Sequence, residues 1–223
     1  MRVATWNMQG GNYSTEDKWN RCVMPRLRSA DGAAADVCCL QECGAVPDSA
    51  VPDGADNGVE RYTWGGTSSR PYLNILFYPW DQNGNRCNLA IVSKTKANGQ
   101  TVAFPAAGPT WRPALIGGWD NAYIASIHAI SPGGADSSGL VRTVKDGAGT
   151  MNWLVLGDFN REPSSNTTAG QLGRMEWAGK TYSTTNPASI YDYAIVSATL
   201  QARRSAVLGQ VVFSDHLPAI FDF

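Results

Sequence analysis

The apolar residues of this chain occur in short runs, and each run ends at a polar or turn-forming residue. Runs of about four to eight apolar or β-branched residues between Gly, Asn, Asp or Pro are typical of buried β-strands. The pattern predicts strands at residues 2–6, 36–40, 72–80, 86–94, 110–116, 123–128, 153–156, 191–196, 207–213 and 218–223. No segment repeats at a fixed period, which argues against a repeat array.

Two segments have a helical pattern. Residues 16–28 predict a helix with Thr15 as its cap and a kink at Pro25, because proline removes a backbone donor. A weaker helix is predicted at 135–145. Residues 44–58, rich in Pro, Asp, Gly and Ala, and residues 162–187, polar and irregular, are interpreted as loops. The Asn-Gly pair at 83–84 predicts a hairpin between two of the strands.

Length and composition allow one large core. With 223 residues and 43% apolar residues, we expect one domain covering residues 1–223. The formal net charge is -1, so no global basic field draws the protein to nucleic acid or to an anionic membrane. This argues against non-specific polyanion binding as the main function, but it leaves open a local group of arginines at a site.

The chain contains five cysteines, at positions 22, 38, 39, 43 and 87. They lack the repeated C-x-x-C spacing of a structural zinc site, and their pairing stays open. No run of 18 apolar residues is present, so we expect no transmembrane segment. Residues 2–6 have the pattern of a strand and not of a signal peptide. We expect either a cytosolic protein or a secreted one whose leader has been replaced by Met1.

The stretch at residues 153–161, W-L-V-L-G-D-F-N-R, places polar residues directly after a buried strand. Gly157 allows a turn there and presents Asp158 and Asn160 at the carboxyl edge of the sheet, where open α/β sheets place their chemistry. The alternative is a simple Asx turn. Other predicted strands are also flanked by polar residues, and the whole set is Asn7, Glu42, His128, Asp158, Asn160, Asp192, Asp215 and His216.

Each member of this set has an ordinary structural explanation, such as a turn residue or a surface charge. Together they supply the parts of metal-assisted phosphodiester hydrolysis: a carboxylate for a divalent cation, amides for phosphate oxygens and imidazoles for proton transfer. Both histidines of the chain belong to the set. No nucleophile motif such as G-x-S-x-G competes with this interpretation.

Several short motifs carry a family resemblance along the whole chain. They are T-W-N-M-Q-G at 5–10, L-Q-E at 40–42, S-R-P at 69–71, N-L-A-I-V-S at 88–93, R-P at 112–113, I-H-A at 127–129, G-D-F-N-R at 157–161, D-Y-A-I at 192–195 and S-D-H-L-P at 214–218. With these motifs the chain resembles the endonuclease/exonuclease/phosphatase superfamily, whose members have the deoxyribonuclease I-like fold. W-N-M-Q-G, S-R-P and N-L-A-I-V-S most resemble the nuclease subunits of cytolethal distending toxins.

The resemblance implies a four-layer α/β sandwich, in which two mixed β-sheets lie face to face, helices cover the outer faces and the active site lies at one end. It implies that Glu42 binds Mg²⁺ with help from Asn7 and Asp215, with Mn²⁺ or Ca²⁺ able to substitute or assist. The residues implied to contact substrate phosphates are Asn7, Asn160, Arg70 and Arg112.

The proton-transfer roles also come from the resemblance. Asp192 would orient His216, which would activate the attacking water. Asp158 would position that water, and His128 would assist the leaving oxygen. The connections at 131–150 and 162–191 are shorter than in the toxin subunits.

The expected function is Mg²⁺-dependent hydrolysis of double-stranded DNA by the active subunit of a toxin. Such a subunit would have delivery or lectin-type partner subunits, would be secreted and would act in the host nucleus. A phosphoinositide phosphatase is the enzyme alternative, because the same chemistry cleaves phosphomonoesters. The non-enzyme alternative is an inactive binding module, against which the complete set of polar groups argues.

Overall fold

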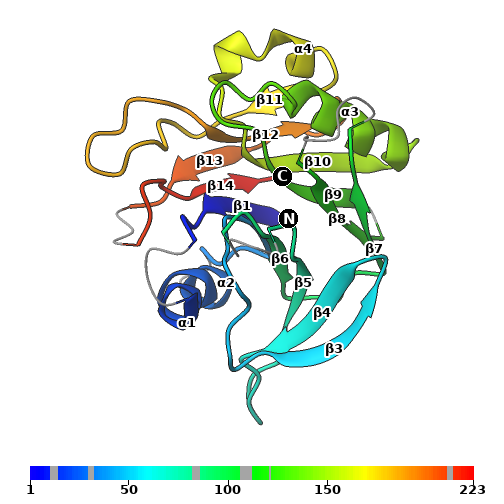
Figure 1. The fold of residues 1–223 in the computed structure, drawn as a ribbon, viewed down its shortest axis with the longest axis vertical. Helices are drawn as coiled ribbons and strands as arrows, with labels where there is room; N and C mark the ends of the chain where they lie inside the picture. Colours follow the sequence, from blue (N-terminus) through cyan, green and yellow to red (C-terminus); the bar gives the residue numbers. More distant parts are fainter. Residues whose placement is uncertain (11–14, 30–32, 82–85, 106–111, 121, 210–212) are drawn as a thin grey trace.

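Two mixed β-sheets form the centre of the molecule in the computed structural model, which describes residues 1–10, 15–29, 33–81, 86–105, 112–120, 122–209 and 213–223 (Figure 1). The eight-stranded sheet has the order β13-β14-β1-β2-β6-β5-β4-β3, and the six-stranded sheet has the order β11-β12-β10-β9-β8-β7. The pairs β1/β2 and β9/β10 are parallel, and the other pairs are antiparallel.

The strands have the following bounds. The eight-stranded sheet contains β1 (Arg2–Asn7), β2 (Val37–Gln41), β3 (Val51–Asp56), β4 (Val59–Trp64), β5 (Leu73–Tyr78), β6 (Leu89–Ser93), β13 (Arg204–Val207) and β14 (Ala219–Asp222). The six-stranded sheet contains β7 (Gly99–Ala103), β8 (Ala114–Trp119), β9 (Ala122–His128), β10 (Asn152–Asp158), β11 (Arg174–Glu176) and β12 (Asp192–Val196).

Helices cover the outer face of each sheet, as Figure 1 shows. On the eight-stranded sheet lie α1 (Thr15–Lys18), a π-helical turn (Trp19–Val23) and α2 (Met24–Arg28); on the six-stranded sheet lie a 3₁₀ turn (Pro163–Ser165), α3 (Ser137–Ala148) and α4 (Thr167–Gly170). A third apolar cluster, which includes Val3, Cys39, Ile91, Ile124 and Leu154, fills the space between the sheets. The expected four-layer α/β sandwich is therefore confirmed.

The helix predicted from residue 16 begins at Thr15 and is not broken at Pro25. A π-helical turn, Trp19–Val23, comes directly before α2, and Pro25 lies in the first turn of α2. The backbone N–H of Met24 donates to the carbonyl oxygen of Trp19, so the chain stays helical up to the proline, which has no N–H of its own to leave unpaired. No helix in the described part of the chain is long and apolar enough to cross a membrane.

The interpretation of 44–58 as a loop is wrong, because β3 lies within it, and β4, β7 and β11 were not predicted. β3, β7 and β11 are edge strands and are largely exposed, so they lack the apolar run that marks a buried strand. A strand was predicted at 207–213, but the structure has β13 at Arg204–Val207. Residues 210–212 lie outside the described residues. So do residues 110–111 and the Asn-Gly pair at 83–84.

The cysteines are all free thiols, and four of the five are buried. Cys43, which directly follows Glu42, donates from Sγ to the carbonyl oxygen of Asn88 at 3.2 Å. Burial raises the pKa of the Cys43 thiol. The thiol is therefore an unreactive packing group behind the end of β2.

Candidate active site

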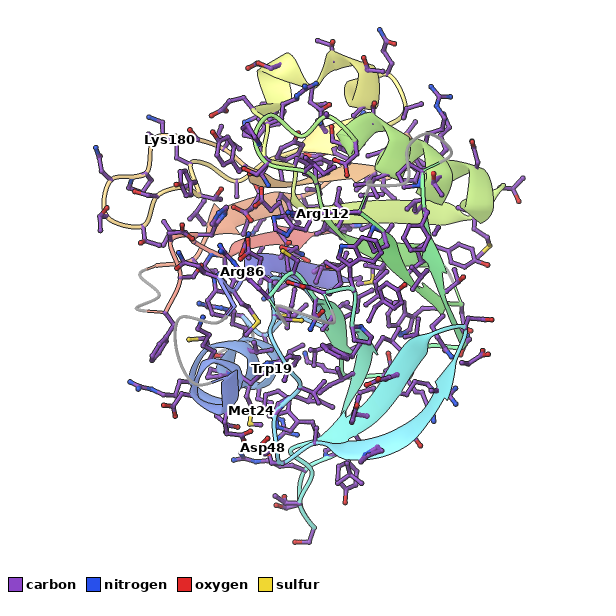
Figure 2. All side chains as sticks on the ribbon, viewed as in Figure 1. Trp19, Met24, Asp48, Arg86, Arg112 and Lys180 are labelled. Atoms are coloured by element: carbon purple, nitrogen blue, oxygen red, sulfur yellow. The ribbon has the colours of Figure 1, made fainter. Side chains whose placement is uncertain are left out.

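A cleft of about 440 Å³ lies at the end of the sandwich where β1, β2, β9 and β10 end. We call it the active-site cleft, and its lining residues are Glu42, Arg86, Cys87, Arg112, His128, Ser131, Pro132, Gly133, Asp158, Asn160, Tyr182, Tyr191, Asp215 and His216. The parallel pairs explain this gathering, because the carboxyl ends of parallel strands meet at one edge. Arg86 and Arg112 are labelled near the middle of the view in Figure 2, where the two sheets meet.

Asn7 joins the two sheets within the site. Its Nδ2 donates to Oδ2 of Asp158 at 2.9 Å and to Oε1 of Glu42 at 3.3 Å. Its Oδ1 accepts a hydrogen bond from the backbone N–H of Gln9 at 2.9 Å. Asn7 thus turns its amide nitrogen, and not its oxygen, toward the carboxylates. This orientation suits Asn7 to donate hydrogen bonds, and it suits the expected role of Asn7 as a metal ligand less well.

Glu42 lies just past the end of β2 with a φ of 46°, a left-handed conformation that costs a non-glycine residue about 1–2 kcal/mol. Its Oε2 accepts from Nε of Arg86 at 2.7 Å. Arg86 was not predicted as a site residue. Its only sequence signal is its position two residues before N-L-A-I-V-S. The sequence pattern predicted Arg86 as the first residue of the strand at 86–94.

His216 and Asp192 form a buried pair, with Nδ1 of His216 2.7 Å from Oδ2 of Asp192. Burial opposes the charge on His216, but the charge and hydrogen bond of Asp192 outweigh it and raise the pKa of His216 to about 10. Oδ2 of Asp158 lies 3.8 Å from Nε2 of the same ring. Burial raises the pKa of Asp158 to about 7, although the positive His216 opposes this. These groups share protons as one unit.

His128 places Nε2 3.5 Å from Oε1 of Glu42 and 3.5 Å from Oδ2 of Asp158. Burial lowers the pKa of His128, and the positive charges of Arg112 and His216 lower it further. Its Nδ1 is buried with no hydrogen-bond partner in the described part of the protein. The two histidines therefore differ: one has a carboxylate on Nδ1, and the other does not.

Asn160 both forms the Asx turn and lies at the cleft, so the two interpretations of its position in the sequence hold together. Its backbone N–H donates to Oδ1 of Asp158 at 2.8 Å, which is the Asx turn, and its φ is 48°. Its Nδ2 donates to Oδ2 of Asp158 at 3.2 Å and to the carbonyl oxygen of Ala129 at 3.0 Å. The turn thus holds the amide at the cleft, with both Nδ2 hydrogens donated to Asp158 and Ala129.

The remaining predicted residues separate into two groups. Arg112 lines the cleft, and its Nη1 donates to the carbonyl oxygens of His128 at 3.5 Å and Ala129 at 3.4 Å. Asp215 also lines the cleft, with Oδ1 3.9 Å from Nε2 of His216. Arg70 does not belong to the cleft.

Arg70 lies just before the start of β5, beside a separate hollow that includes Tyr72 and Lys94. The start of β5 pairs with the end of β6, whereas the cleft lies where β6 begins. Five residues of strand separate the two ends by about 17 Å. Arg70 therefore lies at the opposite end of the sheet, and its expected contact with substrate phosphates is not supported at the cleft.

Two further features of the site had no sequence signal. Tyr182 and Tyr191 stack with ring centroids 5.3 Å apart, and Tyr182 lies 5.0 Å from the ring of His216, so they form one wall of the cleft. Lys18 is buried, and its Nζ donates to the carbonyl oxygens of Met8 and Gln9 at 2.7 Å each. It fixes the turn that follows Asn7.

The donors fit a hard divalent cation. Mg²⁺ is commonly held by one or two carboxylates together with waters and substrate phosphate. Glu42 faces the cleft and can supply such a ligand. Among the described residues, Asp158, Asp192 and His216 also bring three ligand atoms within 4.8 Å of one another. His216 and Asp192 are hydrogen-bonded to each other, and Glu42 is bonded to Arg86 and Asn7, so a cation at either place would compete with an existing contact.

A fold of two stacked mixed sheets with this set of polar groups at one end is that of a hydrolytic phosphodiesterase. The chain belongs to the Endonuclease/Exonuclease/phosphatase family, whose profile matches residues 4–216. Within the family it is similar to a cytolethal distending toxin subunit homolog of Salmonella typhi, with 32% identity over 99% of this chain and 88% of the relative.

Two solved structures agree with this. The Haemophilus ducreyi cytolethal distending toxin includes a chain with a TM-score of 0.84 and 30% identity, over 99% of this chain and 97% of that one. A structure described as CdtB, the biologically active subunit of cytolethal distending toxin, has a TM-score of 0.85 and 28% identity, over 99% of this chain and 96% of that one. Nuclease or phosphodiesterase activity thus follows from the family, and an inactive binding module does not.

Proposed function

We propose that this protein is a Mg²⁺-dependent endodeoxyribonuclease that acts as the active subunit of a toxin. The observation that carries the proposal is the junction of the two sheets, where Asn7 bonds both Glu42 and Asp158 beside the His216 and Asp192 pair. A divalent cation on Glu42 would polarise a phosphoryl oxygen and offset the charge of the reacting phosphate. Side chains of the protein would bind the phosphate and carry out the proton transfers.

The scissile phosphate would lie among the amides of Asn7 and Asn160, both of which have an Nδ2 at the junction. Arg86 and Arg112 would hold phosphates at the rim, because a guanidinium can bind phosphate through two parallel hydrogen bonds. Each Nδ2 already donates both of its hydrogens within the site, so each amide would exchange one of these bonds for a bond to the phosphate.

The water proton would be taken up by the unit of His216, Asp192 and Asp158. Nε2 of His216 and Oδ2 of Asp158 lie 3.8 Å apart, so a water that contacts both has an acceptor in Asp158, and a second acceptor in His216 once the ring has released its Nε2 proton. Asp192 holds the imidazole by Nδ1 and stabilises its charged form. Nε2 of His128 lies 3.5 Å from the same Oδ2 of Asp158 and would assist the leaving oxygen.

The enzymatic part is tested by relaxation of supercoiled plasmid set beside phosphate release from phosphoinositides, each in Mg²⁺ and in EDTA. We expect nicking that needs the cation and that Glu42→Ala abolishes, while far-ultraviolet circular dichroism and Tm show a folded variant. Nicking in EDTA, or an unchanged rate in Glu42→Ala, would contradict the metal role. Phosphoinositide hydrolysis without nicking would assign the site to phosphomonoesters.

The toxin part rests on the names of the relatives, which are subunits of a multi-subunit toxin. We propose that delivery subunits bring the protein to host cells and that it acts in the host nucleus. Purified protein electroporated into cultured mammalian cells should enter the nucleus and produce DNA-damage foci, and Glu42→Ala should not. Equal foci with both proteins would contradict the proposal.

A further inference from the structure

Directly beneath the active site lies a layer of buried polar side chains that the proposed chemistry does not use. Side chains along a strand alternate between its two faces, so a residue two positions before a site residue lies one layer below it. Thr5 is in that position below Asn7 on β1, and Ser126 is in that position below His128 on β9. Gln41, at the end of β2, reaches into the same layer. None of the three has any exposed surface.

These side chains form a hydrogen-bonded bridge between the two sheets. Nε2 of Gln41 donates to Oγ of Ser126 at 2.9 Å, and that hydroxyl donates back across the gap to the carbonyl oxygen of Leu40 at 3.0 Å. Within the eight-stranded sheet, Oγ1 of Thr5 donates to Oε1 of Gln41 at 3.2 Å. The Ser126 hydroxyl is thus both acceptor and donor across the sheet interface.

The layers farther from the site are apolar. They include Val3 and Cys39 on one sheet and Ile124 and Leu154 on the other. Apolar contacts are not directional, so they hold the sheets together without specifying how one lies on the other. A hydrogen bond depends steeply on distance and angle, and a buried one is costly to leave unmade. The bridge is therefore suited to define the spacing and register of the sheets.

That spacing matters because the site is divided between the sheets. Asn7 and Glu42 belong to the eight-stranded sheet, whereas His128 and Asp158 belong to the six-stranded sheet. A displacement of about 1 Å between reacting groups can reduce a rate about a hundredfold. We infer that the Gln41 and Ser126 bridge is a positioning device that holds the two halves of the catalytic site in register.

This inference rests on the active site proposed above, and it does not depend on the natural substrate. The test therefore uses bis(4-nitrophenyl) phosphate, a small phosphodiester, at saturating Mg²⁺ and well below Tm. Ser126→Cys replaces the hydroxyl with a somewhat larger thiol that forms only weak hydrogen bonds, and Gln41→Met replaces the amide with an apolar chain of similar length. Ile124→Val, two residues before Ser126 and equally buried, is the matched control.

We expect kcat to fall roughly tenfold to a hundredfold in Ser126→Cys and in Gln41→Met, with KM nearly unchanged. The double variant should be little worse than either single one, since both lose the same bridge. Ile124→Val should keep the wild-type kcat although it loses packing. Wild-type kcat in both bridge variants would overturn the inference, as would an equal fall in Ile124→Val, which would indicate a general effect of core damage.

A second measurement needs no turnover and so separates this inference from the proposed activity. The chain has two histidines, His128 and His216, and their imidazole resonances report the geometry of the site. We expect both resonances to shift in Ser126→Cys and to stay in place in Ile124→Val. Unshifted resonances in a folded Ser126→Cys would overturn the positioning role. If the wild-type protein has no phosphodiesterase activity but the resonances still shift in Ser126→Cys, the positioning role is supported and only the proposed function is contradicted.

Discussion

Nδ1 of His216 lies 2.7 Å from Oδ2 of Asp192 in a part of the site where neither side chain has appreciable exposure. The two residues belong to different sheets: β12 begins at Asp192, and His216 lies three residues before β14. Their contact therefore ties the sheets together at the cleft. It also decides the charge of the imidazole, which is the property that several predictions test.

Asp192→Asn should lower the pKa of His216 well below the value of about 10 in the wild type, because burial opposes the charged ring once the carboxylate charge is gone. Nuclear magnetic resonance titration of the imidazole resonances measures this directly. The pKa of His128 should rise in the same variant, because the positive charge of His216 lowers it in the wild type. An unchanged pKa of His216 would mean that Asp192 does not hold it.

The same substitution should reduce phosphodiester hydrolysis by about 10²–10⁴-fold, close to the loss in His216→Ala, because the carboxylate and the imidazole act as a unit. The double variant should then be little worse than either single one. A complete cycle of kcat/KM values at saturating Mg²⁺ measures this. Losses that simply multiply across the cycle would show that the two residues work separately.

The free energy of unfolding should fall on the alkaline side. The pKa of His216 rises from 6.5 in the unfolded chain to about 10 in the fold, so its contribution is fully present below pH 6.5 and is lost as pH rises through 10. The pKa of Asp158 rises from 3.8 to about 7, and its contribution is lost in the same direction, between those values. Tm measured in EDTA should therefore drop more between pH 6 and 9.5 in the wild type than in His216→Asn. Parallel curves for the two proteins would exclude this contribution of His216.

Arg86→Ala should have opposite effects on cation and substrate. Nε of Arg86 holds Oε2 of Glu42 at 2.7 Å, so its removal should tighten Mg²⁺ binding to the free protein roughly two- to fivefold, a small change because the arginine is largely exposed. The KM for DNA should rise, because a phosphate-binding cation is lost. Isothermal titration with Mg²⁺ and steady-state kinetics measure the two effects. Arg174→Ala, an exposed arginine on β11, is the control, and weaker Mg²⁺ binding in Arg86→Ala alone would contradict the prediction.

Arg112→Ala should weaken duplex binding equally for all DNA sequences and reduce the slope of log affinity against log salt by about one, since each cation on the backbone releases a counterion. Arg70→Ala, at the opposite end of the eight-stranded sheet, should leave the slope unchanged. Fluorescence anisotropy at several salt concentrations, in Ca²⁺ and a His216→Ala background, measures both. A lower slope in Arg70→Ala would show that DNA extends to the far end of the molecule.

The family resemblance implied the fold class, and the sequence pointed to half of the residues that line the cleft. Short apolar runs marked the buried strands, and polar residues directly after them, such as Asn7 and Asp158, gathered where parallel strands end. The edge strands β3 and β7 left no comparable pattern, because an edge strand exposed to water needs no apolar run.

Which residues meet was decided by tertiary structure. Arg70 belongs to the S-R-P motif and Arg86 only precedes a motif, but the antiparallel pairing of β5 with β6 places Arg70 at the far end of the sheet and leaves Arg86 beside Glu42. Asn7 and Asp158, 151 residues apart, bond only because one sheet lies on the other in a particular register. The sequence by itself determined most of the buried strands and the polar residues at their ends, since these depend on neighbours along the chain. Only the tertiary structure decided the pairings, because they depend on packing and hydrogen bonds between residues far apart in sequence.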